Sequence, residues 1–170
     1  MKLRPKQFVT QTDCVFMELL AAHGFAEDGY HKEDDWHVCR RYRSGDRYIE
    51  ITANCHFRDG QPECRLILGH GSHEWPETDW NKIALWRLSG GDQNYPFNSI
   101  DEIAGILDKM CIDLNQHAAD FLANDLTKFK TARAIQNRDR KPYTIHSPQS
   151  DGSYGSAVDP ESAELKRKFS

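Results

Sequence analysis

One stretch of the chain, LGHGSHEWPETDWNKIALWRL at 68–88, gathers more side chains capable of chemistry than any other. It combines imidazoles, carboxylates and indoles in a run that glycine and proline interrupt. Three uses are open for it: a structural seam between two elements, a recognition surface, or a site of chemistry. The residues in it or beside it that we predict to contact a partner are Trp75, Trp80, Tyr42, Tyr48, Glu74, Glu77 and Asp79.

The aromatic side chains favour recognition over catalysis. Trp and Tyr are enriched at the energetic centres of protein interfaces. We expect the surface to be formed by the 69–80 loop, flanked by Tyr42 or Tyr48 and by the acidic connector 27–35. The predicted function is therefore a non-enzymatic protein that binds a partner protein, while a Trp that only covers one end of the core is the structural alternative.

A metal site is the second interpretation of the same loop. His70 and His73, with His56 from a neighbouring strand, are the candidate ligands. Zinc needs four converging ligands, or three and a water molecule, and no HExxH, HxxEH or paired CxxC spacing occurs. We therefore predict no bound metal and no cofactor. The alternative function is a metal-dependent or acid/base hydrolase-type enzyme with its site near residues 69–80.

Motifs for covalent catalysis and for phosphate binding are missing from the sequence. There is no GxSxG nucleophile elbow and no GxxxxGK[ST] loop, so no catalytic residue is predicted. The formal net charge of −4 is spread unevenly, because residues 125–141 carry +4 and 142–170 carry −1, which leaves −7 for 1–124. The acidic body argues against a nucleic-acid partner and suits a basic protein partner.

The elements that position these residues follow from hydrophobic periodicity. Strands are predicted at about 35–43, 47–57 and 63–69, and residues 83–88 suit either a fourth strand or a short helix. Helices are predicted at 6–23, at 99–122 behind a Ser99 capping box, and at 125–137. The order gives an α+β fold in which an antiparallel meander of three to five strands is covered on one face by the 6–23 and 99–122 helices.

The ends of the chain complete the expected organisation. Residues 1–140 are predicted to form one domain, and the Ser-, Gly- and Pro-rich segment 141–170 a mobile or surface-wrapped tail. Five widely spaced cysteines indicate free thiols. No signal peptide and no apolar run long enough for a membrane span are present. We therefore expect a cytoplasmic protein without a membrane partner.

Four short motifs carry a resemblance to a group of bacterial proteins. LLAAHGF closes the first helix, RYR and YIEIT lie in the meander, LILGHG ends a strand, and WRL precedes the long helix. Together they resemble bacterial α+β domains of unknown function, some of which are encoded beside toxins and regarded as immunity proteins. The resemblance spans residues 10–124, leaves out WPETDW and the segment after Leu126, and implies a toxin-immunity or accessory role. It assigns no catalytic residue.

Overall fold

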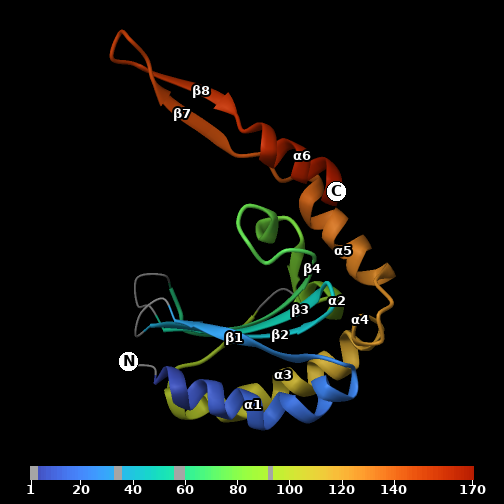
Figure 1. The fold of residues 1–170 in the computed structure, drawn as a ribbon. Coiled ribbons are helices and arrows are strands. Elements are labelled where there is room, and N and C mark those ends of the chain that lie inside the picture. The colour runs from blue at the N-terminus through green and yellow to red at the C-terminus, as the bar shows by residue number, and fades with distance from the viewer. Residues whose placement is uncertain (1–3, 33–35, 56–59, 92–93) are drawn as a thin grey trace.

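The structure is a computed structural model that describes residues 4–32, 36–55, 60–91 and 94–170. An antiparallel sheet, several helices and a separate two-stranded ribbon make up the chain (Figure 1), so the predicted α+β class is confirmed. The helices are α1 (Pro5–Ala22), α2 (Trp86–Ser89), α3 (Ile103–His117), α4 (Ala119–Leu122), α5 (Thr127–Arg138) and α6 (Pro160–Phe169), with 3-10 turns η1 (Glu77–Asp79) and η2 (Ile100–Glu102). The strands are β1 (Ala26–Lys32), β2 (His37–Ser44), β3 (Arg47–Asn54), β4 (Glu63–His70), β5 (Lys82–Ala84), β6 (Tyr95–Pro96), β7 (Thr144–Pro148) and β8 (Tyr154–Val158).

The predicted meander forms the centre of the sheet as β2, β3 and β4. Tyr42 of β2 pairs with Ile49 of β3, and Ile49 pairs with Leu68 of β4. Directly paired residues share a face of the sheet, and these three are buried in the core. Gly45 joins β2 to β3 with a φ of 59°, a left-handed conformation that favours glycine in tight hairpins.

The strands at the sides of the meander differ from the sequence-based expectation. No strand is predicted for the acidic connector 27–35, but Ala26–Lys32 pairs with β2 as strand β1. Its side chains are nearly all exposed, so backbone pairing, which no hydrophobic pattern reveals, forms this strand. The segment 83–88 divides between both of its predicted states, since β5 ends at Ala84 and α2 begins at Trp86.

Helices α1 and α3 lie together on one face of the sheet, as the sequence predicts (Figure 1). The buried residues of α3 recur at helical spacing and join a common core with those of α1 and the meander. The single helix expected over 99–122 is three consecutive segments, η2, α3 and α4, with an interruption at Ala118. Ser99 is the N-cap of the first segment, since its hydroxyl accepts a hydrogen bond from the Asp101 N–H at 3.3 Å.

The segment 141–170 forms regular structure where the sequence predicts a mobile or surface-wrapped tail. Strands β7 and β8 pair as a hairpin, and α6 follows and packs against α5. Asp159 caps α6 by accepting a hydrogen bond from the Ser162 N–H at 3.0 Å, and Pro160 occupies the first turn. The hairpin projects beyond the rest of the molecule (Figure 1).

Candidate functional site

The loop 71–81 lies over the second face of the sheet and is fixed to it by Tyr48. The Tyr48 hydroxyl donates to the Asn81 side-chain oxygen at 2.6 Å. Its ring crosses β4 at Gly69, where an added Cβ would lie 2.0 Å from the ring atom Cζ. Tyr48 is fully buried and therefore does not contribute to a surface, which corrects its predicted role in partner binding.

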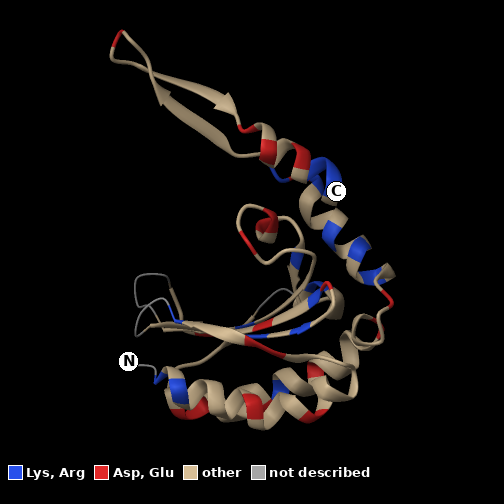
Figure 2. Ribbon diagram, viewed as in Figure 1, with Lys and Arg blue, Asp and Glu red and all other residues tan. Residues whose placement is uncertain are grey.

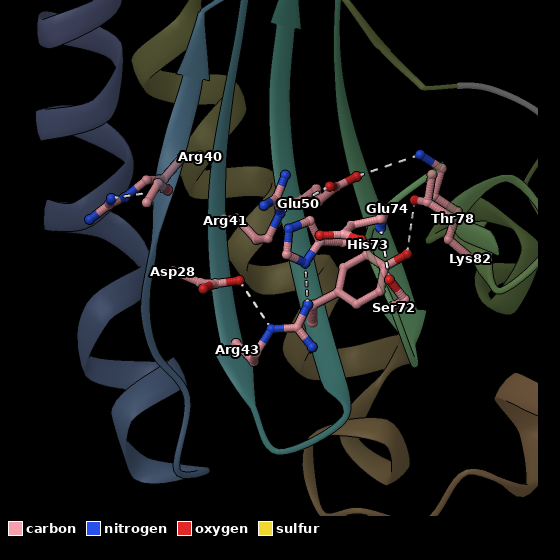
Figure 3. A network of polar contacts seen from close by, with 12 residues as sticks. Asp28, Arg40, Arg41, Arg43, Glu50, Ser72, His73, Glu74, Thr78 and Lys82 are labelled. Carbon is pink, nitrogen blue, oxygen red and sulfur yellow. Dashed lines mark hydrogen bonds and ion pairs between the residues drawn. The ribbon is translucent and has the colours of Figure 1, made fainter. Parts of the chain in front are cut away.

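A second link between sheet and loop joins Arg43 to His73. Arg43 Nη2 lies 2.6 Å from His73 Nδ1, while its Nε donates to Asp28 at 3.0 Å (Figure 3). Because a guanidinium only donates, His73 accepts through Nδ1 and is a neutral imidazole. Burial and the neighbouring cations Arg41 and Arg43 lower the pKa of His73, which outweighs the opposing effect of Asp28 and Glu50.

This contact predicts that stability depends on pH. Since the pKa of His73 is lower in the folded than in the unfolded state, the stabilisation is complete above the unfolded value near 6.5. It decreases as the pH falls through that value towards the folded pKa. Urea unfolding between about pH 8 and pH 5 should therefore show a steeper loss of stability in the wild-type protein than in His73→Gln. Parallel curves for the two proteins would exclude a contribution from His73.

The face of the sheet beyond His73 is polar, and its acidic and basic side chains are paired with each other. Glu50 lies 3.2 Å from Arg41 and 3.7 Å from Lys82, and the three side chains line a cavity of about 310 Å³ (Figure 3). Cys39 lines the same cavity, but burial raises the pKa of its thiol to about 12. The thiolate is the nucleophilic form, so Cys39 is not activated for attack at neutral pH.

Of the candidate metal ligands, the structure describes His70 and His73. His70 and His73 both line a hollow of about 510 Å³, whereas His56 lies outside the described residues. Within the described ranges, no group of three or more His, Cys, Asp or Glu side chains is placed to hold a metal ion. The metal-dependent form of the enzymatic alternative therefore has no cluster of ligands to support it in that part of the chain.

Two further residues predicted to contact a partner are core residues. Trp80 is 0% exposed and packs with Leu165 and Phe169 of α6. Tyr42 is buried below the sheet, where its hydroxyl donates to Asp13 at 2.6 Å. Both residues are therefore too buried for the predicted recognition role, and Trp80 is buried in a cluster with α6 that is separate from the main core.

Two of the three acidic side chains of the loop, those of Glu77 and Asp79, form hydrogen bonds or ion pairs with other parts of the chain. The backbone N–H of Ser72 donates to Glu77 at 3.2 Å, and Lys168 of α6 lies 3.3 Å from the same carboxylate. Although partial burial opposes it, these contacts lower the pKa of Glu77. Asp79 accepts hydrogen bonds from the Tyr143 hydroxyl and, through its carbonyl, from Arg140. The loop thus ties the C-terminal segment to the sheet, and of the predicted contact residues Glu74 and Trp75 remain exposed.

The exposed aromatic surface continues from the loop into the hairpin. Trp75 is 70% exposed and stacks on Tyr143, with ring centroids 6.1 Å apart and an interplanar angle of 17°. Tyr143 immediately precedes β7, on which Ile145 is exposed, and β8 adds the exposed Tyr154 and Val158. These hairpin residues are not predicted from the sequence, because their Ser- and Gly-rich surroundings are typical of a mobile tail.

Charge is absent from both strands of the hairpin. Figure 2 shows basic residues in blue along α5 and at the end of α6, whereas β7 and β8 are tan up to a turn that carries an acidic residue in red. Strands TIHSP and YGSAV contain no Lys, Arg, Asp or Glu, in a chain with 28% charged residues. The exposed ribbon therefore differs in chemistry from the helices that hold it.

The comparisons with known proteins assign no family to this chain. Among the described residues, no helix has the length and apolar character needed to cross a bilayer. The toxin-immunity role implied by the resemblance thus stays a prediction. Protein-family models, curated proteins and solved structures were all compared with this chain, and none matches it.

Proposed function

We propose that this protein acts by binding another protein, without catalysis, through its projecting hairpin. The observation that carries the proposal is an uncharged ribbon with exposed Ile145, Tyr154 and Val158 that is held away from the body. The accessory or toxin-immunity role is a narrower form of this proposal and depends on which protein is bound.

The hairpin itself lacks the burial that normally stabilises a sheet. All but one of its strand residues are exposed, and neither of its faces packs on the body. An isolated two-stranded hairpin is only marginally stable in water, and a third strand or a packed face is usually needed. A partner that covers this ribbon would supply that missing packing.

The base of the hairpin is anchored firmly enough to present it. Tyr143 stacks on Trp75 and donates to Asp79, and its backbone N–H donates to Ser162 of α6 at 2.9 Å. On the other strand, the Asp159 N–H donates to the Tyr143 carbonyl at 2.9 Å. Holding a recognition element in one orientation reduces the entropy that binding must overcome.

The proposal predicts that the apolar side chains of the hairpin carry binding energy. The triple variant Ile145→Thr, Tyr154→Thr and Val158→Thr should weaken binding to a partner isolated from the native host by a factor of about thirty or more, equivalent to about 2 kcal/mol. Its melting temperature should not change, because none of the three side chains is buried. Affinity is measured with both purified proteins by isothermal titration calorimetry.

A matched control separates this effect from general surface hydrophobicity. Ile112 lies on α3 and is 65% exposed, so Ile112→Thr removes a comparable side chain from a different face. The control should bind the partner like the wild-type protein. Equal affinity of the triple variant and the wild-type protein would reject the hairpin as the docking element.

A further inference from the structure

We infer that the hairpin pairs with the hairpin of a second copy of this chain, β8 against β8, around a two-fold axis at Ser156. The inference rests on the proposed role of the hairpin as a docking element. It identifies one binding partner for the hairpin, which is strand β8 of a second copy of the chain. The product would be a four-stranded antiparallel sheet in the order β7-β8-β8-β7, with one body at each end.

The hydrogen bonds of the hairpin show which backbone groups are free. Gln149 donates to the Ser153 carbonyl and Asp159 to the Tyr143 carbonyl, both within the pairs that flank β7 and β8. In an antiparallel pair, hydrogen-bonded and non-hydrogen-bonded residue pairs alternate. The backbone groups of the intervening pairs 144/158, 146/156 and 148/154 therefore point outwards from the ribbon.

Of the two outer edges of the hairpin, that of β8 is better suited than that of β7 to pair with an added strand. On β8 the outward groups belong to Tyr154, Ser156 and Val158, each of which has both an N–H and a C=O. On β7 the third outward position is Pro148, which has no N–H to donate. Proline on an edge strand is a recognised protection against pairing, and β8 has no such protection.

One edge of the main sheet, strand β1, is by contrast protected. Strand β1 contains an irregularity between Glu27 and Tyr30 and includes charged residues. Bulges and charges both disfavour pairing with another chain. The hairpin is therefore a more open edge for an added strand than β1.

The sequence of β8 is suited to pairing with itself. With Ser156 opposite Ser156, Tyr154 of each copy faces Val158 of the other, and each of these pairs exchanges two backbone hydrogen bonds. Aromatic residues opposite β-branched residues are favourable cross-strand pairs. Tyr154 is 72% and Val158 59% exposed in the single chain, so the pairing covers two apolar side chains that otherwise face water.

The geometry also keeps the two bodies apart. Antiparallel pairing of the ribbons places the bodies at opposite ends, and the hairpin projects well beyond each body (Figure 1). Repulsion between the acidic 1–124 regions is then reduced by distance and by salt. Because short strands bury less than the roughly 1,600 Å² of a stable complex, we expect a reversible dimer that forms at about 100 µM.

Sedimentation velocity of the full chain over a concentration series tests the pairing. Wild-type protein should shift from monomer to dimer, and Ser156→Pro should stay monomeric because it removes the outward N–H at the axis. His146→Pro is the matched control: it removes the same 2.9 Å Ser156–His146 side-chain contact and places proline at the outward position on β7. It should still dimerise. The assignment of β8 as the pairing strand would be overturned if His146→Pro were monomeric and Ser156→Pro dimeric. It would also be overturned if both variants had the same oligomeric state.

A charge exchange tests the register and does not depend on proline. Tyr154→Lys with Val158→Glu places opposite charges across the axis, whereas Tyr154→Lys with Val158→Lys places like charges there. The first double variant should dimerise more strongly at low than at high salt, and the second should remain monomeric. Equal behaviour of the two variants would overturn the register.

The outcome for the inference is separate from that for the proposed function. Wild-type protein that stays monomeric over the whole series overturns the self-pairing, even if Ile145→Thr, Tyr154→Thr and Val158→Thr together abolish binding of a host protein. Conversely, dimers of the wild-type protein combined with unchanged host binding by that triple variant would reject the proposed function and support the self-pairing.

Discussion

Replacing Trp80 with alanine is expected to lower the free energy of unfolding by about 3–5 kcal/mol. Trp80 is fully buried, packs with Leu165 and Phe169, and lies 4.5 Å from the Arg140 guanidinium above its ring. Its carbonyl also accepts a hydrogen bond from Asn137 at 2.7 Å. Removing the indole leaves a cavity between the loop and α6 that the surrounding chain can fill only by moving.

The loss should be concentrated in the C-terminal segment. Hydrogen exchange of the α6 amides should accelerate more than that of β3, because α6 is attached to the body through this contact. Trp75→Ala provides the control: the side chain is 70% exposed, so its removal should cost less than about 1 kcal/mol. Denaturant unfolding of both variants measures the difference. Equal losses, or slower exchange in α6 than in β3, would contradict the anchoring role of Trp80.

Replacing Asp13 with alanine should cost about 3 kcal/mol of stability. Asp13 receives two hydrogen bonds from Arg40, at 2.7 and 2.9 Å, and a third from Tyr42. The Arg40 side chain is 4% exposed, so removing the carboxylate leaves a buried cation whose remaining carboxylate partner, Glu27, is half exposed. A buried charge without its partner is strongly unfavourable.

Two further variants test whether the loss of stability comes from the buried, unpaired charge of Arg40. Asp28→Ala breaks the more exposed ion pair with Arg43 and should cost at most about 1 kcal/mol. Adding Arg40→Met to Asp13→Ala removes the buried cation and should restore part of the lost stability. Chemical denaturation of the four proteins provides the values. A double variant less stable than Asp13→Ala would show that Arg40 stabilises the fold through contacts other than this pair.

The sequence predicts the centre of the fold well because burial leaves a periodic pattern. Strand β3 alternates apolar and polar residues, and α3 repeats apolar residues at helical spacing, since each packs one side on a shared core. Strand β1 was missed because its partner is backbone and its side chains face water. The Asp159-Pro160 pair is a helix-start signal that could have identified α6.

The site was harder to predict because its residues depend on distant partners. Trp80 is buried by Leu165 and Phe169, which lie far along the chain in a segment interpreted as a tail. Spacing within 68–88 cannot distinguish a buried from an exposed tryptophan when the covering helix is not recognised. The sequence predicts the loop as a connection between two elements, and the structure places it between β4 and β5. The hairpin of β7 and β8, whose base this loop contacts, is not predicted.

The separation of the hairpin from the core has a consequence for divergence. Substitutions within β7 and β8 affect almost no buried side chain, so under the proposed function they would alter recognition at little cost to folding. The ribbon can therefore exchange one binding preference for another while α1, α3 and the meander stay unchanged. Under the proposed function, selection on binding and selection on stability would act on different residues, which would make the hairpin a natural position for grafting new recognition sequences.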